Sequence, residues 1–392
     1  MILLLILQAL LLTYLGGAAL YLLGYALAGF AAKARRDEQV PPHEALARIA
    51  VFIPAYREDA VILHSAREAL RLDYPTSHWR LVVVADGLQP GTLMQLRQLP
   101  LEVVVVHFDK STKSKALNAA MGQLGGSYDL ALIFDADNIG QTDILYRISH
   151  LWQRGYRAIQ CRRVAKNLDT PFAVLDAMSE EINNHIFSAG HRACGLSSRL
   201  VGSGMAFDYG LFREVMATVD AVGGFDKELE LKLLGRGIEV AYLPSVRVWD
   251  EKVSQAQVFA GQRRRWIAAQ FHYARHYFGP ALGALLRQGN IDYFDKACQM
   301  MLPPRLMLPG LLLAGALLAL LLGGGVWAWL WGAAFAANAL AFALAIPRHL
   351  YRRQYLRAFL HLPRAFGVMA LALLRLRGSN RQFIHTPHRM TH

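Results

Sequence analysis

The apolar residues of this chain are concentrated at its two ends. Residues 2–30 are almost wholly apolar and carry no charge, which is long enough for a helix that crosses a bilayer. Two further apolar stretches cover 306–323 and 326–346 and are separated by Gly323, Gly324 and Gly325. The pattern predicts three membrane spans around one large soluble region, residues 45–300.

Basic residues flank these apolar stretches. Lys33, Arg35 and Arg36 follow the first, and four arginines at 348–357 follow the third. Since Lys and Arg favour the cytoplasmic side, we expect the amino terminus outside and the soluble region and carboxyl terminus in the cytoplasm. The first stretch has no basic n-region or obvious cleavage site, so it is expected to be an anchor.

The expected units are an anchor at 1–31, a cytosolic domain at 45–300 with interfacial helices near its end, two transmembrane helices at 301–347, and a cytosolic or interfacial tail at 348–392. The apolar stretch 358–376 contains Pro363, Arg364 and Arg375. Charge inside a bilayer is costly, which favours a helix in the interface; the alternative is a fourth span. We predict a multi-pass protein of the inner or plasma membrane.

The soluble region alternates apolar runs with predicted helices. Strands are expected at 48–54, 79–85, 102–106 and 130–134, and helices at 60–72 and 113–124. This alternation predicts a doubly wound α/β domain with a mostly parallel sheet. The strands end in carboxylates that would share one edge of the sheet, the edge at which ligands bind: Glu58, Asp86, Asp135 and Asp137.

Asp135 and Asp137 follow the most apolar of these strands. Side chains two apart on a strand point the same way, so the two carboxylates are expected on one side. Two such oxygen ligands can hold Mg²⁺ or Mn²⁺, with phosphate oxygens completing the shell. The alternative is an Asp/Asn turn without a ligand.

The formal net charge of +13 does not indicate nucleic-acid binding, because the basic residues flank apolar spans. Attraction to anionic lipid headgroups explains them better. Cys161, Cys194 and Cys298 lack the spacing of metal ligands and are expected to be reduced thiols.

Several motifs occur in the order typical of one enzyme family. They are Ile53-Pro54-Ala55-Tyr56, Asp86, Lys113 to Asn118, Asp135-Ala136-Asp137, Gly202 to Phe207, and Gln262-Arg263-Arg264-Arg265-Trp266. Over residues 48–300 the chain resembles the membrane-embedded family 2 glycosyltransferases of inverting GT-A type, such as cellulose, chitin, hyaluronan and poly-N-acetylglucosamine synthases. It departs from the family where Arg57 replaces the usual Asn.

The resemblance implies the roles of individual residues. A group for the nucleotide sugar would comprise Ala55, Tyr56, Glu58, Asp86, Lys113, Asp135, Gln262, Arg264 and Trp266. Asp135 and Asp137 would hold the metal ion, and Arg265 would contact phosphate. The catalytic base is expected at Glu228, where the family has Asp; Asp226 and Glu230 are its rivals.

The preferred hypothesis is an enzyme that adds sugar from a UDP-sugar, with N-acetylglucosamine or glucose as first guesses, to a growing β-linked glycan at the cytoplasmic face. One alternative is the transfer of a single sugar to a lipid carrier. Another is an inactive nucleotide-sugar-binding scaffold. Expected partners are the donor, a glycan or lipid-linked acceptor, membrane lipid, and a homo-oligomer or export partner. The tail at 383–388 is a candidate gate over the nucleotide site.

Overall fold

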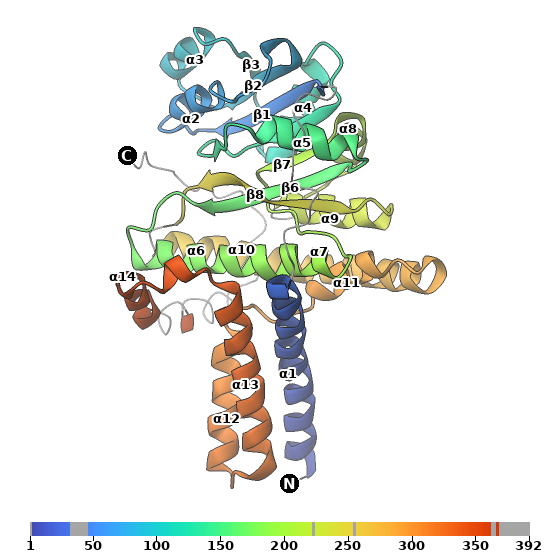
Figure 1. Cartoon of the computed structure of the whole chain (residues 1–392), viewed down its shortest axis with the longest axis vertical. Helices are drawn as coiled ribbons and strands as arrows, with labels where there is room; N and C mark the ends of the chain where they lie inside the picture. The colour runs from blue at the N-terminus through green and yellow to red at the C-terminus, as the bar shows by residue number, and fades with distance from the viewer. Residues whose placement is uncertain (1, 32–45, 222–223, 254–255, 362–365, 368–392) are drawn as a thin grey trace.

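The computed structural model describes residues 2–31, 46–221, 224–253, 256–361 and 366–367. Figure 1 shows three parts stacked along the long axis of the molecule. A sheet with helices on its faces lies farthest from the N-terminus, a layer of helices lies beneath it, and a stalk of long helices projects from that layer.

The sheet has eight strands in the order β3-β2-β1-β4-β7-β6-β8-β5. Their bounds are β1 Ile49–Tyr56, β2 Trp79–Asp86, β3 Glu102–Val106, β4 Leu130–Ile133, β5 Ile139–Gly140, β6 Ala158–Ala165, β7 Met205–Asp208 and β8 Val240–Asp250. The first four strands in sheet order are parallel. β7 runs antiparallel to both β4 and β6, and β5 runs antiparallel to β8. The predicted α/β class is confirmed, and the sheet is mixed beyond β4.

Helices cover both faces of the sheet because alternate residues of each strand point to opposite sides. Val51 and Ile53 of β1 belong to the core that includes α2 (Ile62–Ala69), α3 (Pro90–Arg97) and α5 (Ile144–Gln153). Ala50 and Phe52 of the same strand belong to the core that includes α4 (Lys113–Gln123), α8 (Tyr209–Met216) and α9 (Phe225–Gly235).

A layer of helices separates the sheet from the stalk (Figure 1). It comprises α6 (Pro171–Asn183), a π-helix labelled η3 (Asn184–Gly190), α7 (His191–Ala193), α10 (Ala256–Gln288) and α11 (Ile291–Gln299). Thr170 begins α6, because its side chain accepts a hydrogen bond from Ala173 N at 3.2 Å, and Pro171 suits the first helical position.

The stalk contains α1 (Ile2–Ala31), α12 (Leu308–Leu321) and α13 (Gly325–Ala345), which lie side by side in Figure 1. Two helices, Leu5–Ala31 and Gly325–Ala345, are long and apolar enough to cross a membrane. α12 has 14 residues and is shorter than the predicted span 306–323, because Pro309 marks its start and Gly323, with φ 110°, follows its end.

The chain continues beyond the stalk through η4 (Arg348–Tyr351), α14 (Arg353–Leu356) and η5 (Arg357–His361); a further short helix, η2 (Thr76–His78), precedes β2. Ala358 of η5 is buried in the core shared with α6. Most of the predicted interfacial helix at 358–376 and the proposed gate at 383–388 lie outside the described residues.

Candidate active site

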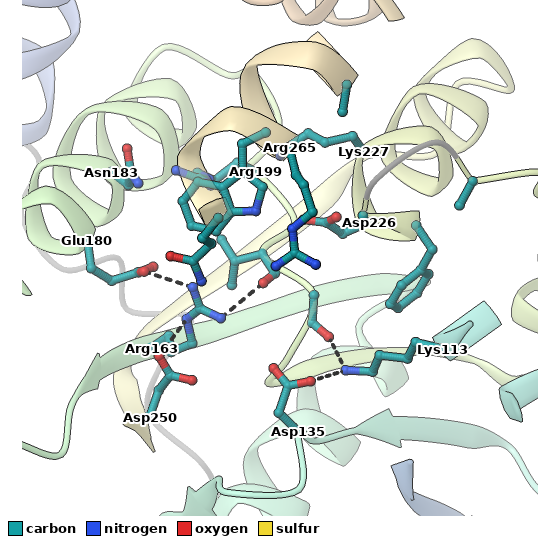
Figure 2. Close-up of a pocket in the computed structure, with 18 of the residues that line it drawn as sticks. Lys113, Asp135, Arg163, Glu180, Asn183, Arg199, Asp226, Lys227, Asp250 and Arg265 are labelled. Atoms are coloured by element: carbon teal, nitrogen blue, oxygen red, sulfur yellow. Dashed lines mark hydrogen bonds and ion pairs between the residues drawn. The ribbon is translucent and has the colours of Figure 1, made fainter. Parts of the chain in front are cut away.

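A cavity of about 500 Å³ connects the edge of the sheet to the helix layer above the stalk. Its wall at the sheet is formed by the ends of β1, β2 and β8, the turn after β4 and the start of α4. Its opposite wall is formed by α6, η3, α9, α10 and the linker of residues 299–306 that leads into α12. Figure 2 shows the charged side chains that face this space.

Four residues predicted to bind the nucleotide lie at or just after the ends of β1 and β2. Ala55, Tyr56, Glu58 and Asp86 all line the cavity, and Glu58 and Asp86 are buried. The two strand ends are held together by a hydrogen bond from Arg57 N to Asp86 O at 3.0 Å. The parallel pairing of β1 with β2 therefore brings these residues together as predicted.

Asp135 and Asp137 also line the cavity, but β4 ends at Ile133. The alternation of strand side chains therefore does not place them, and that part of the prediction is wrong. Asp135 forms an ion pair with Lys113. Asp137 is buried, and its Oδ2 accepts a hydrogen bond from Glu251 N at 2.9 Å. The turn directs the two carboxylates to different neighbours around one cavity.

The chemistry of these two carboxylates fits Mg²⁺ or Mn²⁺. Both offer hard oxygen ligands, and Mg²⁺ is commonly held by one or two carboxylates together with substrate phosphates and water. Among the described residues, no group of three or more His, Cys, Asp or Glu side chains could hold a metal ion without such help. Oxygens of the bound substrate and of water would complete the coordination of a metal ion at this site.

The glycine loop that begins at Gly202 places Lys113 beside Asp135. Lys113 Nζ donates to the carbonyl oxygen of Gly202 at 2.8 Å, as Figure 2 shows. Gly202 and Gly204 have φ values of 86° and 60°, a region that favours glycine. The loop also contributes Ser203, whose Oγ accepts a hydrogen bond from Asp135 N at 3.1 Å.

The side chains of the three acids considered as the catalytic base point in different directions from α9. Asp226 lines the cavity, whereas Glu228 and Glu230 do not. Glu228 instead pairs with Lys232 at 2.7 Å and accepts a hydrogen bond from Asp220 N at 3.3 Å. Glu228, the expected base, is therefore not among the residues that line the cavity, because the helix turns its side chain away.

Glu230 is fully buried and holds α9 against the neighbouring segments through ion pairs and a hydrogen bond. It pairs with Lys227 and with Lys296 of α11, each at 3.1 Å. Its Oε1 also accepts a hydrogen bond from Leu200 N at 2.9 Å. Burial alone would raise the pKa of Glu230, but the two lysines hold that pKa below its usual range. Such a paired carboxylate is a poor general base.

The predicted signature on α10 is only partly directed into the cavity. Gln262, Arg265 and Trp266 line it, and Arg264 does not. The side chain of Arg263 lies outside the described residues. Burial lowers the pKa of Arg265, whose guanidinium lies near the centre of Figure 2. The cation of Arg265 therefore borders the cavity, whereas that of Arg264 does not.

A buried ionic network in the wall of the cavity was not predicted from the sequence. Arg163 of β6 donates to Glu180 of α6 at 2.8 Å and lies 3.7 Å from Asp250 of β8. Lys252 is 2.7 Å from Asp250 and 3.5 Å from Glu180. Asp250 and Lys252 are two residues apart, at and just after the end of β8, but Arg163 and Glu180 lie far from them in the sequence, so no local sequence signal connects the whole network.

The end of the cavity nearest the stalk was also not predicted from the sequence. Its wall includes Asn183, Phe187, Met300, Leu302, Pro303, Pro304, Arg305 and Leu306. The guanidinium of Arg305 lies over the ring of Phe187, 4.9 Å from its centroid. The only relevant feature of the sequence was that Arg305 stands immediately before an apolar stretch. That position indicates a residue near a membrane surface and does not indicate a residue of a binding site.

Comparison with known proteins agrees with the geometry. The family model described as "Glycosyltransferase like family 2" matches residues 47–269. The chain is 26% identical over 282 residues to the beta-monoglucosyldiacylglycerol synthase of a Synechocystis strain, which covers 68% of this chain and 57% of that relative. It is 21% identical to the probable glycosyltransferase YdaM of Bacillus subtilis, over 56% of this chain and 54% of that protein. The chain thus spans little more than half the length of these relatives.

Among solved structures, a mannosyltransferase of Pyrobaculum calidifontis in complex with GDP-Man and Mn²⁺ has a similar fold. The TM-score is 0.52 at 20% identity, and the match covers 86% of this chain and 98% of that one. This likeness concerns the fold: a GT-A sheet with its cavity at the strand ends.

Proposed function

Because this chain belongs to the glycosyltransferase-like family 2 and has a GT-A fold, we propose that it is a glycosyltransferase that transfers one sugar from a UDP-sugar to a lipid acceptor at the cytoplasmic face of a membrane. The observation that supports this most is the course of the cavity. It runs from Asp86 and Asp135 at the sheet to Leu302 and Leu306 in the linker that enters the stalk.

The donor would lie at the sheet end of the cavity. Ala55, Tyr56 and Asp86 would hold the base and ribose, and Lys113 and Arg265 would contact the diphosphate, since cations and Arg in particular suit phosphate oxygens. A divalent cation held by Asp135 and Asp137 would neutralise the departing diphosphate.

Asp226 would be the general base for an inverting transfer. It would take the proton from the acceptor hydroxyl while the hydroxyl oxygen bonds to the anomeric carbon. The bond between that carbon and the diphosphate breaks, and UDP leaves. Asp226 lines the cavity opposite Lys113 in Figure 2, which suits attack from the side away from the leaving group.

A lipid acceptor suits the membrane-side end of the cavity. The wall there combines the apolar side chains of Phe187, Leu302 and Leu306 with the cation of Arg305. Such a wall can contact both an acyl chain and the polar headgroup to which it is attached. The name of the Synechocystis relative, a glycolipid synthase, agrees with an acceptor of this kind.

Elongation of a β-linked glycan is the second candidate. It is supported by Gln262, Arg265 and Trp266, which line the cavity and resemble the signature of processive synthases. Trp266 would then serve as a platform for the acceptor sugar. Replacing Trp266 by Ala would shorten a polymeric product, whereas a lipid-linked monosaccharide would keep its size.

The test uses the full chain in nanodiscs of total membrane lipid, with a panel of radiolabelled UDP-sugars and Mn²⁺. Chloroform-soluble label of the size of one sugar on a lipid is the expected product. Water-soluble polymer would favour the second candidate. Absence of UDP release from every donor would favour an inactive scaffold.

A further inference from the structure

Arg199 lies inside the cavity without an ion pair. It lines the cavity between α9 and η3, and its backbone N donates to Phe187 O at 3.2 Å. Within the described ranges, no hydrogen bond or ion pair of 4 Å or less joins its guanidinium to another side chain. This differs from Lys113, Arg163 and Lys252, each of which pairs with a carboxylate.

The carboxylates around Arg199 are mostly engaged elsewhere. Glu180, Glu230 and Asp226 attract Arg199 at longer range, and Asp226 is the proposed general base. Glu180 is already bound by Arg163 and Lys252, and Glu230 is bound by Lys227 and Lys296. The positive charge of Arg199 therefore faces the cavity without a close counter-ion, an arrangement that favours an anionic ligand.

Asn183 provides a second, independent indication of a polar ligand. It lines the cavity at the end of α6, is 5% exposed, and its Oδ1 has no hydrogen-bond partner among the residues that the structure describes. An unpaired buried amide oxygen is costly, and a hydroxyl group of a ligand would satisfy it. Figure 2 shows Asn183 and Arg199 on the same side of the space that Asp226 and Lys113 face.

The position of Arg199 indicates where this ligand would lie relative to the reacting groups. The segment that follows it leads directly to the glycine loop, where Gly202 accepts a hydrogen bond from Lys113. In the other direction, the bond to Phe187 connects Arg199 to the membrane-side wall. A group bound at Arg199 would thus lie between the transferred sugar and the membrane, where the acceptor headgroup belongs.

We propose that the acceptor is an anionic lipid whose headgroup phosphate or carboxylate is bound by Arg199 and whose hydroxyl groups contact Asn183. This rests on the proposed function and specifies its acceptor. Guanidinium binds either anion through two parallel hydrogen bonds. Three lipid sources share this chemistry: a glycerophospholipid such as phosphatidylglycerol, a polyprenyl phosphate, and a uronic acid glycolipid.

The test measures binding without a donor, so that it can succeed or fail independently of sugar transfer. The full chain in neutral maltoside micelles is titrated with short-chain phosphatidylglycerol, farnesyl phosphate, glucuronosyl dioctanoylglycerol and neutral dioctanoylglycerol. At least one anionic lipid should bind about 10-fold or more tightly than the neutral lipid, as one charge-assisted hydrogen bond predicts.

Arg199→Gln should remove that preference while the affinities for dioctanoylglycerol and for UDP with Mn²⁺ stay unchanged. Arg199→Lys should restore part of it. The matched control is Arg192→Gln, which removes a guanidinium that pairs with Glu239 at 3.2 Å and does not line the cavity; it should keep the preference.

Equal binding of neutral and anionic lipids by the parent protein would overturn the proposal, whatever the variants do. A loss of UDP affinity in Arg199→Gln would also overturn it, by assigning the guanidinium to the donor diphosphate. Binding of anionic lipid without any transfer to lipid would refute the proposed function and leave this site standing.

Discussion

Asp226 and Glu228 lie two residues apart on α9, so their side chains point about 200° away from each other. Asp226 faces the cavity, and Glu228 faces Lys232. A base must come within about 3 Å of the proton that it removes, and only the first of these side chains is in the cavity. A shift of two residues in the alignment at this motif therefore changes which carboxylate is assigned as the base.

We predict that Asp226→Asn lowers the rate of sugar transfer by about 10²-fold or more, because the amide keeps the shape but loses basicity. UDP affinity should be unchanged. Initial rates at saturating donor, together with UDP titration, measure both. Glu228→Gln is the matched control and should keep nearly the parent rate, because its carboxylate does not line the cavity. Inactivity of the control with an active Asp226→Asn would return the role to Glu228.

The charges of individual residues also determine the stability of the fold. The ionic network is formed by Arg163, Glu180, Asp250 and Lys252. Lys252 is 2% exposed. Burial alone would raise the pKa values of Glu180 and Asp250, but Arg163 and Lys252 hold both below their usual range. Carboxylates with a depressed pKa stabilise the fold above their unfolded pKa of about 4 and lose that contribution as the pH falls through the folded pKa.

We predict that Lys252→Met lowers the free energy of unfolding by about 3–5 kcal/mol at pH 7, because it leaves two buried carboxylates to share the single cation of Arg163. Thermal unfolding between pH 3 and pH 8 measures this. The difference from the parent should be constant above pH 5 and shrink below about pH 4. Exposed Lys115 is the control, and Lys115→Met should shift Tm little at any pH. A deficit that persists undiminished at pH 3 would contradict the electrostatic explanation.

At the scale of elements, the sequence predicted β1 to β4 and α4 closely, because each is a strongly apolar run or a capped helix. Thr112 begins α4 by accepting a hydrogen bond from Lys115 N at 3.2 Å. The sequence did not reveal that β7 is antiparallel between β4 and β6, since pairing partners depend on contacts distant along the chain. For the same reason Arg199 and Asn183 were not identified as cavity residues.

η3 and α1 approach each other closely enough to require glycine. A Cβ atom built on Gly190 would lie 2.2 Å from the backbone oxygen of Tyr25. His185 of η3 also contacts Ala26 O at 2.9 Å. Because Phe187 and Asn183 border the cavity, the contact between η3 and α1 positions one wall of the cavity relative to the stalk.

We predict that Gly190→Ala separates η3 from α1 and lowers stability by about 1–3 kcal/mol, the usual effect of overpacking. Thermal unfolding in detergent measures the change. Gly24 of α1 has nothing within 4 Å of a built Cβ, so Gly24→Ala is the control and should be neutral or stabilising. Equal Tm values for the two variants would show that the backbone contact is not tight.

At the scale of the whole molecule, the linker of residues 299–306 that borders the cavity leads into α12, and the turn between α12 and α13 lies at the far tip of the stalk (Figure 1). If the stalk crosses the membrane, the linker and this turn lie on different sides of it. Cys194 is exposed in the helix layer, and Val326 is 68% exposed near the tip. The two positions therefore test the orientation inferred from the basic flanks.

We predict that a membrane-impermeant maleimide labels Cys194 in inverted membrane vesicles and not in intact cells. Val326→Cys in a Cys194→Ser background should show the reverse, because the stalk places it across the bilayer. Cys194→Ser alone is the control for Cys161 and Cys298. Labelling of both positions from the same side would contradict a spanning stalk.

The cavity's membrane-side wall also determines the route by which the acceptor would reach the enzyme. A lipid that enters beside Leu302 and Leu306 arrives by lateral diffusion, and its effective concentration is a number per unit of membrane area. Dilution with inert lipid would then slow the reaction at constant total acceptor, as in other surface-diluted enzymes. The rate of synthesis would therefore depend on the fraction of acceptor lipid in the surrounding leaflet and not on the volume of the cytosol.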